Sequence, residues 1–192
     1  MLKLKYGNTN TFYIRGKTGG LLVDTDYAGT LGAFYKTIKQ YHLHIRDIDY
    51  MLATHYHPDH IGLISQLMKQ SVKLLLIDLQ LPYVHFSDAI FQKNHIPYSP
   101  IQEKDATIIS ISESRSFLQK LGINGEILST PSHSADSITL ILDNGECYVG
   151  DLEPESYIEG YDDNTRLKGD WNLIHNYNPK YIYYAHANET IL

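Results

Sequence analysis

Short segments with strand character alternate with amphipathic, helix-like segments along this 192-residue chain, and that alternation limits the fold more than any other feature of the sequence. Strands are predicted at residues 11–15, 20–25, 49–54, 73–77, 107–111, 126–130, 137–142, 146–150 and 181–185. Helices are predicted at residues 30–42, 61–69, 82–93 and 169–177, and an exposed acidic loop at residues 151–168. Such alternation is typical of the α/β class. No linker or low-complexity segment interrupts it, so a single domain over residues 1–192 is expected.

Local signals support two of these predictions. Apolar and aromatic residues recur at helical spacing between residues 30 and 42, and Thr30 is placed to cap the start of that helix. Further along the chain, the dipeptide Asn144-Gly145 separates two apolar strand-like segments. This dipeptide favours the positive φ angles of a tight turn, so the two segments are predicted to form a hairpin.

Four side chains that bind metals well lie within six residues, namely His55, His57, Asp59 and His60. They occupy the junction between a predicted strand and the helix that follows it. Imidazole and carboxylate ligands together suit zinc and related divalent metals. His55 and His57 are two residues apart in an extended segment and can point the same way, while Asp59 and His60 follow around the turn. One short loop can therefore serve two adjacent ions.

This His-x-His-x-Asp-His pattern resembles the signature of the metallo-β-lactamase superfamily. The later ligands of that family have counterparts here in the expected chain order. Residues 130–133 (Thr-Pro-Ser-His) resemble its Thr-Pro-Gly-His segment, residues 148–151 (Tyr-Val-Gly-Asp) resemble its strand ending in Gly-Asp, and Ala185-His186 follows the last predicted strand. The resemblance implies a four-layer αββα sandwich with these metal ligands: His55, His57, Asp59, His60, His133, Asp151 and His186.

The resemblance also implies a role for individual residues. It gives His133 to the first metal, His186 to the second metal, and Asp151 to a position bridging the two. Asp59 would be the catalytic residue that orients the attacking water and shuttles its proton. Asp24 matches a position from which an aspartate orients a ligand histidine by hydrogen bonding; the alternative is an exposed aspartate in a turn.

This chain departs from the family pattern in the residue before His133. Ser132 stands where the family often has glycine, which implies an altered backbone next to His133 and not the loss of that ligand. The ligand set resembles that of glyoxalase II enzymes. The sequence ends six residues after His186, so the C-terminal helical domain of those enzymes is expected to be absent.

A dinuclear-metal hydrolase is the function that these residues predict. Two divalent ions about 3.5–4 Å apart can share a water molecule and lower its pKa towards neutrality. Zn²⁺ is the first expectation for both ions, with Mn²⁺ or iron as alternatives, and the substrate is an ester, thioester, lactone, amide or phosphodiester. Two other functions stay open: a mononuclear iron enzyme that resembles persulfide dioxygenases, and a non-catalytic metal-binding module.

Composition bears on partners and location. The formal net charge is −6 and Lys and Arg do not cluster, which argues against nucleic acid as the partner and favours a small-molecule substrate. The N-terminus lacks the apolar run of a signal peptide, and no stretch is long enough to cross a membrane. A cytoplasmic protein without membrane contact is therefore expected, and its 16 tyrosines would suit a homodimer.

The remaining histidines lack the spacing of metal ligands. They are His42, His44, His85, His95 and His175. His42 and His44 are expected at the surface or at a helix end, and ordinary surface positions are favoured for His85 and His95 over a role in binding substrate. The segment 78–111, which carries His85, His95 and Tyr98, lies where the family varies its substrate-facing insertions, and the sequence does not decide its role. Cys147 is expected in the core, and Trp171 in the core or an interface.

Overall fold

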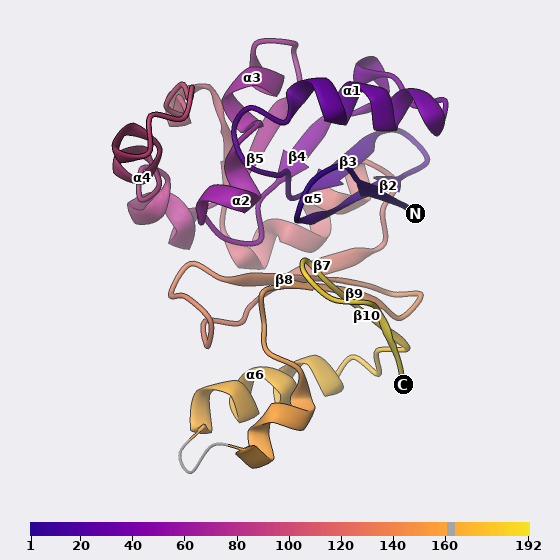
Figure 1. Ribbon diagram of the computed structural model, residues 1–192. Coiled ribbons are helices and arrows are strands. Elements are labelled where there is room, and N and C mark those ends of the chain that lie inside the picture. Colours follow the sequence, from indigo (N-terminus) through magenta and orange to yellow (C-terminus); the bar gives the residue numbers. More distant parts are fainter. Residues whose placement is uncertain (161–163) are drawn as a thin grey trace.

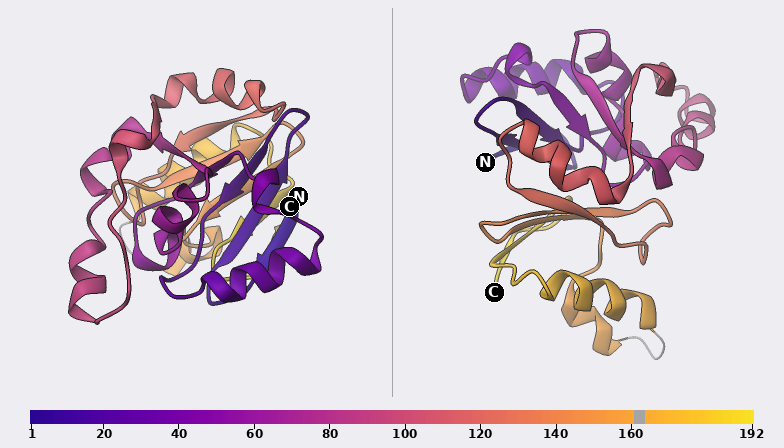
Figure 2. Two further views of the ribbon diagram at one scale, coloured as in Figure 1. Left: turned by 90° about the horizontal axis from the view of Figure 1, so that it is seen from above. Right: turned by 180° about the vertical axis from the view of Figure 1, so that it is seen from behind.

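Two β-sheets lie face to face at the centre of the computed structural model, which describes residues 1–160 and 164–192. Helices cover the outer face of each sheet (Figure 1). The two further views in Figure 2 show the same order of layers, with α6 on the far side of the second sheet from the other α-helices.

The first sheet has six strands in the order β1-β2-β3-β4-β5-β6. Their bounds are β1 Leu2–Lys5, β2 Asn10–Arg15, β3 Gly20–Val23, β4 Tyr50–Leu52, β5 Lys73–Ile77 and β6 Thr107–Ile109. The pairs from β1 to β3 are antiparallel, and those from β3 to β6 are parallel. Parallel strands end at the same edge of the sheet, so the loops that follow them meet there.

The second sheet has five strands in the order β11-β10-β9-β8-β7. Their bounds are β7 Gly125–Ser129, β8 Ile138–Leu142, β9 Glu146–Gly150, β10 Tyr181–Tyr184 and β11 Thr190–Ile191. β7, β8 and β9 pair antiparallel, which confirms the predicted hairpin, whereas β10 runs parallel to β9. The ends of β9 and β10 therefore lie side by side.

The helices are short. The α-helices are α1 Leu31–Gln40, α2 Pro58–Ile61, α3 Ile64–Met68, α4 Asp88–Lys93, α5 Ser114–Lys120 and α6 Thr165–His175. Short stretches of 3-10 helix occur at η1 Ile45–Asp47, η2 Asp78–Tyr83, η3 Glu103–Asp105, η4 Ile111–Glu113 and η5 Glu155–Gly160.

Three hydrophobic clusters define the layers. One packs α1 and α3 against the first sheet, the second fills the space between the sheets, and the third packs α6 against the second sheet. Alternation along single strands produces this division. In β3, Leu21 and Val23 point between the sheets while Leu22 faces the helices. In β8, Leu140 points between the sheets while Ile141 faces α6. The α/β class and the αββα sandwich are thus confirmed.

Several predicted boundaries were wrong. The 61–69 helix is two helices, α2 and α3, and the 82–93 helix is η2 and α4 joined by a turn. That turn holds Ser87, whose buried hydroxyl donates a hydrogen bond to the Tyr56 carbonyl, so tertiary contact overrides helical spacing there. Strands β1 and β11 and helix α5 were missed.

The predicted loop 151–168 was also wrong in part. It contains η5 and the first turn of α6. Asn164 caps α6 by accepting a hydrogen bond from the Leu167 amide at 3.1 Å, and Leu167 is buried against the second sheet. The side-chain cap and the buried leucine therefore stabilise the start of the helix in this polar stretch. Residues 161–163 of the predicted loop lie outside the described residues.

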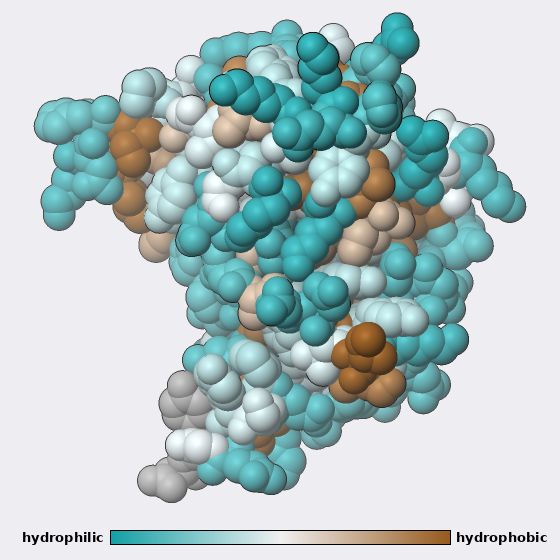
Figure 3. All heavy atoms as spheres, turned by 45° about the vertical axis from the view of Figure 1, so that its right-hand side comes forward, coloured by the Kyte–Doolittle hydropathy of each residue, from teal (hydrophilic) through white to brown (hydrophobic). Residues whose placement is uncertain are grey.

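The surface is mostly hydrophilic on the face drawn in Figure 3, where apolar side chains form separate small patches. Cys147 and Trp171 are buried in the cluster beneath α6, as predicted for a core position. Within the described residues, the helices are too short or too polar to cross a membrane.

Candidate metal centre

The loop after β4 brings the first four predicted ligands to the edge of the first sheet. His57 has an extended backbone (φ −73°, ψ 156°) and caps α2, and Pro58 occupies the first helical position, where its missing N–H costs nothing. Asp59 and His60 therefore lie inside the first turn of α2, which begins three residues earlier than the predicted helix. The change from extended chain to helix turns the side chains of this loop in two directions.

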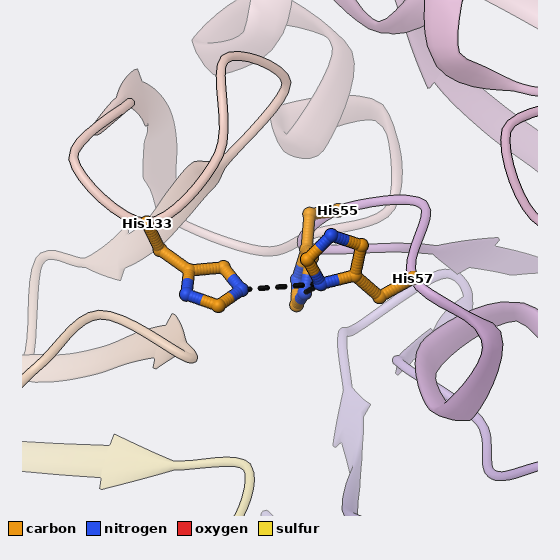
Figure 4. A group of neighbouring side chains, drawn as sticks. All are labelled: His55, His57 and His133. Atoms are coloured by element: carbon orange, nitrogen blue, oxygen red, sulfur yellow. Dashed lines mark hydrogen bonds between the residues drawn. The ribbon is translucent and has the colours of Figure 1, made fainter.

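Three histidines form the first group of potential ligands. Nε2 of His55 lies 2.9 Å from Nδ1 of His57, and Nε2 of His133 lies 3.2 Å from the same Nδ1. Figure 4 shows the three rings pointing toward one another, with His133 arriving from the β7–β8 loop on the opposite side. Three imidazole nitrogens at this spacing can bind one divalent cation.

A second group lies on the other side of the loop. Nε2 of His186, which follows β10, lies 3.1 Å from Oδ2 of Asp59, and Nε2 of His60 lies 3.9 Å from Oδ1 of Asp59. The three side chains have ligand atoms close enough to share one ion. His60 is fully buried, whereas Asp59 is partly accessible and His186 is exposed.

Asp151 lies between the two groups. Its Oδ2 is 3.8 Å from Nε2 of His55 and 3.7 Å from Nε2 of His133. Its Oδ1 is 3.4 Å from Nε2 of His60 and 3.3 Å from Nε2 of His186. The two oxygens of one carboxylate thus face different groups, and the structure brings all seven predicted ligands together.

Two buried atoms at the centre lack a hydrogen-bonding partner among the described residues, and they face each other. They are Nε2 of His60 and Oδ1 of Asp151. A buried polar atom without a partner is costly, and a cation between such atoms removes the cost. The donor set of imidazoles and carboxylates therefore fits a divalent metal ion.

Charges in the centre shift two histidines in opposite directions. Burial, followed by the neighbouring histidines, strongly lowers the pKa of His55, so this ring stays neutral with a lone pair free for a metal. Burial also opposes ionisation of His60, but the Asp24 and Asp151 carboxylates outweigh it and raise the pKa of His60 to about 10. A proton and a metal ion would therefore compete for His60.

Asp24 contacts the His60 ring nitrogen that points away from the other ligands, the position that the family resemblance implied. Its Oδ2 lies 3.1 Å from Nδ1 of His60, so the ring can donate there and leave Nε2 free. Asp24 also accepts hydrogen bonds from the Thr54 amide at 2.7 Å and the Thr54 hydroxyl at 2.9 Å. It is 2% exposed, so the alternative of an exposed turn aspartate was wrong.

Two glycines let the ligand-bearing segments approach closely. Gly150 precedes Asp151 with φ +60°, and a Cβ there would clash with the Thr54 hydroxyl. Gly62 follows α2, and its Cβ would clash with the backbone of Tyr27 and Ala28. Both positions require the absence of a side chain.

Sequence reasoning missed a buried pair that joins the two ligand loops. Gln80 is fully buried in η2, and its Nε2 donates to the carbonyls of Ala53 and Asp136 at 3.1 Å each. The Asp136 carboxylate in turn accepts a hydrogen bond from the Tyr56 amide at 2.7 Å. These bonds tie the loop of His55 and His57 to the loop of His133. A lone glutamine in a polar segment carries no signal of this role.

The loop of His133 has a second anchor on α6. The Ser132 amide donates a hydrogen bond of 2.8 Å to Oδ2 of Asp170, a residue that is 7% exposed. The backbone of residue 132 therefore ties the loop to the helix layer, whereas the buried Ser132 hydroxyl has no hydrogen-bonding partner among the described residues. Asp170 was not singled out in the sequence.

The other histidines are exposed, as expected for His42, His44, His85 and His95. His85 contacts Asp88 at 2.8 Å, His44 contacts Asp47 at 3.2 Å, and His175 contacts Glu155 at 3.0 Å. In the segment 78–111, Tyr98 stacks on the buried Phe91 with ring centroids 4.2 Å apart. Tyr98 thus belongs to the packing beneath α4.

Comparison with known proteins identifies the class to which this fold and centre belong. A sequence profile described as the Metallo-beta-lactamase superfamily matches residues 4–186. The chain is therefore a member of the metallo-β-lactamase superfamily.

Among individual proteins, the chain is 23% identical over 188 residues to the Beta-lactamase-like protein 2 homolog of Drosophila melanogaster. That match covers 94% of this chain and 59% of the fly protein, so the chain spans well under two thirds of that relative.

Solved structures share the fold. TTHA1429, a metallo-beta-lactamase family protein of Thermus thermophilus, is 20% identical with a TM-score of 0.70, covering 95% of this chain and 70% of that one. TTHA1623, solved in a di-iron-bound form, is 18% identical with a TM-score of 0.75, covering 100% and 94%. The B3 metallo-beta-lactamase BLEG-1 is 16% identical with a TM-score of 0.72, covering 99% and 93%.

Proposed function

We propose that the chain is a hydrolase that uses two divalent metal ions. The observation that carries the proposal is the position of Asp151, whose Oδ1 and Oδ2 face different groups of ligands. A carboxylate placed in this way is suited to bridge two cations. A single ion bound by one group would leave the ligand atoms of the other group without a metal.

Each ion would have its own side chains. His55, His57 and His133 would hold the first, and Asp59, His60 and His186 the second. Bound there, the two ions would supply a Lewis acid for the substrate oxygen and an acidified water as nucleophile. Zn²⁺ suits these ligands, as do Mn²⁺ and iron, and the di-iron form of TTHA1623 makes iron a necessary comparison.

Asp59 would handle the proton. Its side chain is partly accessible, and Oδ2 lies 3.1 Å from Nε2 of His186. Burial raises its pKa, but the hydrogen bond from His186 and the charge of His60 outweigh that effect and lower the pKa. An ionised carboxylate at the rim can accept a proton from water and pass it to the leaving group.

The proposal is tested by a metal count combined with a substrate panel. The purified chain is stripped with chelator, reconstituted separately with zinc, manganese and iron, and analysed for metal content. Two ions per chain and turnover of an ester, thioester, lactone, amide or phosphodiester are expected. His57→Ala should reduce kcat/KM at least about 100-fold, since that ligand's ion can no longer be held in place, while the circular dichroism spectrum stays unchanged.

A matched control is His95→Ala, because His95 is exposed and lies outside both ligand groups. It should keep normal turnover. One iron per chain with oxygen consumption on a persulfide would replace the proposal with the mononuclear iron function. Two bound ions without turnover on the whole panel would leave a metal-binding module.

A further inference from the structure

A hollow of about 520 Å³ lies beside the second group of ligands, between β1 of the first sheet and the chain that follows β10 of the second. The residues that line it carry two ammonium groups and no carboxylate: Lys3, Lys5, Asn10, His186, Ala187 and Asn188. One wall of the hollow is therefore a predicted metal ligand, and another wall is positively charged.

The pairing of β1 with β2 places one of these charges at the metal centre. The two lysines are two residues apart in β1, so their side chains leave the same face of the sheet. Lys5 pairs with Asn10 at the start of β2. The Asn10 amide donates a hydrogen bond of 2.7 Å to the carbonyl of Ala185, the residue before His186. Lys5 is thus the lysine at the end of β1 that is nearest to the predicted ligand.

The polar wall of the hollow is held in place by Asn10. This residue is 4% exposed, and its side-chain amide donates hydrogen bonds of 2.9 Å to the carbonyls of Tyr184 and Ala187. These bonds fix the chain on both sides of His186 against β2. A site whose walls are already fixed loses little entropy when a ligand binds.

One carbonyl oxygen connects Lys5 to His186. The Lys5 ammonium donates a hydrogen bond to the Asn8 carbonyl, and Nδ1 of His186 lies 3.4 Å from the same oxygen. The other ring nitrogen of His186, Nε2, lies 3.1 Å from Oδ2 of Asp59 in the second group of ligands. A molecule with one end at that group therefore has only to extend past the His186 ring to reach Lys5.

The two lysines differ in how far their charges are already neutralised. Nζ of Lys3 lies 3.2 Å from Oε2 of Glu189, in an exposed ion pair. Lys5 forms no ion pair with a carboxylate in the part of the chain that the structure describes, and its bond to the Asn8 carbonyl uses one of three N–H donors. Asn188 adds an exposed amide. A positive charge with free N–H donors is suited to bind a carboxylate or a phosphate.

We propose that this hollow binds an anionic group of the substrate, a carboxylate or a phosphate, while the bond to be hydrolysed lies at the metals. This inference rests on the proposed function. It narrows the substrates to esters, thioesters, lactones, amides and phosphodiesters that carry an anionic group apart from the bond that is cleaved. Lys5 determines specificity, because it recognises this group and touches no reacting atom. Lys3 and Asn188 assist it.

The test measures binding, so it does not depend on knowing the natural substrate. The zinc-reconstituted chain is titrated by calorimetry with three hydroxamates of matched length: butyrohydroxamate, succinate monohydroxamate and 3-phosphonopropionohydroxamate. They share the metal-binding group and end in a methyl, a carboxylate or a phosphonate, so ratios of Kd isolate the contribution of the anion. At least one anionic probe should bind roughly three- to tenfold more tightly than butyrohydroxamate at low salt. The difference should narrow in high salt.

Lys5→Gln should remove most of this preference for the anionic probe. The matched control is Lys120→Gln, which removes the same charge from an exposed position on α5, outside the hollow. It should keep the preference. This control is needed because bound metal ions attract anions by themselves, and only a loss specific to Lys5 places the anion in the hollow.

Glu189→Gln should act in the opposite direction. It releases Lys3 from its ion pair, so the preference for the anionic probe should rise about twofold. A comparison of the carboxylate and phosphonate probes then tells which anion the hollow binds better.

The outcomes separate this inference from the function on which it rests. Equal affinity for the charged and uncharged probes, or a preference that changes alike in Lys5→Gln and Lys120→Gln, overturns the inference while leaving the metal centre intact. Failure of all three probes to bind, together with failure to retain zinc, overturns the proposed function and this inference with it.

Discussion

Asp24 has an unusual backbone as well as an important partner. Its φ of +59° lies in the left-handed region, which asparagine tolerates better than most residues. Asp24→Asn should therefore preserve the fold. The new amide, however, can place an N–H opposite Nδ1 of His60, which forces the ring proton onto Nε2. We expect zinc affinity to fall about 10- to 100-fold, measured by competition with a fluorescent zinc chelator.

The control for this prediction is Asp26→Asn. Asp26 is equally buried and accepts hydrogen bonds from the Thr9 and Tyr27 amides. Neither of these bonds involves a predicted ligand, so zinc affinity should change less than about threefold even if stability falls. Equal losses of affinity in the two variants would mean that charge, and not the orientation of His60, matters.

For Gln80, the predicted effect of a substitution is on the stability of the fold. Gln80→Leu removes the donor to the Ala53 and Asp136 carbonyls and leaves both buried acceptors unpaired. We expect a loss of about 1–3 kcal/mol in the free energy of unfolding, measured by urea denaturation of the metal-free chain.

Gln119→Ala serves as the control for Gln80→Leu, because Gln119 is exposed on α5. A surface change of this kind should stay within about 0.5 kcal/mol of the parent. If Gln80→Leu were equally neutral, the two ligand loops would not depend on this bridge.

Single residues differ in how much the sequence says about them. The seven side chains that converge in the structure could be named beforehand for two different reasons. Four lie within six residues and form a ligand pattern by themselves. His133, Asp151 and His186 could be named only through the resemblance to the metallo-β-lactamase superfamily. That they bind metal stays a prediction. Gln80, Asp136 and Asp170 could not be named, because each makes contacts that depend on segments far away in the chain.

At the level of elements, the end of β9 packs closely against the Thr54 side chain, and a substitution at Gly150 tests that packing. Gly150→Ala should be strongly destabilising, because φ is +60° and the new Cβ would meet the Thr54 side chain. The strain and the displaced Thr54 together should cost more than about 2 kcal/mol. Because Thr54 precedes His55, zinc affinity should fall as well.

A glycine-to-alanine substitution within α6 should instead increase the stability of the chain. Gly169 lies inside the helix with open space around its Cβ position. Gly169→Ala should stabilise the chain by about 0.5–1 kcal/mol, because alanine loses less backbone entropy than glycine in a helix. Thermal unfolding of both variants checks the pair, and a destabilising Gly169→Ala would show that α6 is not a regular helix there.

Elements with strong local patterns were predictable, and those shaped by distant contacts were not. The apolar strand β5 and the Asn144-Gly145 hairpin were found because their own residues specify them. Strand β1, with alternating Leu and Lys, gains its order from pairing with β2. The start of α6 depends on Leu167 packing beneath the second sheet, which no local pattern reveals.

For the whole molecule, the candidate metal centre lies where the two halves of the sandwich meet. Four predicted ligands follow β4 of the first sheet, and the other three follow strands β7, β9 and β10 of the second. Zinc at about 100 times its Kd should therefore stabilise the fold by roughly 2.7 kcal/mol. For a chain of this size that corresponds to a rise of about 5–10 °C in Tm.

Asp151→Ala is the variant that checks this prediction, because it removes the side chain that faces both groups. Its Tm should respond much less to zinc than that of the parent, in scans of matched metal-free samples. A rise of equal size in both proteins would place zinc somewhere other than between the sheets.

The short segment from η2 to α4 carries one residue that holds the ligand loops together and another that faces solvent. Gln80 is buried and links the two ligand loops by hydrogen bonds, whereas Phe86, further along the same segment, is exposed. Substitutions at position 86 should therefore leave the hydrogen bonds between the ligand loops intact, because the exposed Phe86 makes none of them. Substitutions at position 80 would instead remove these hydrogen bonds and destabilise the fold around the ligand loops.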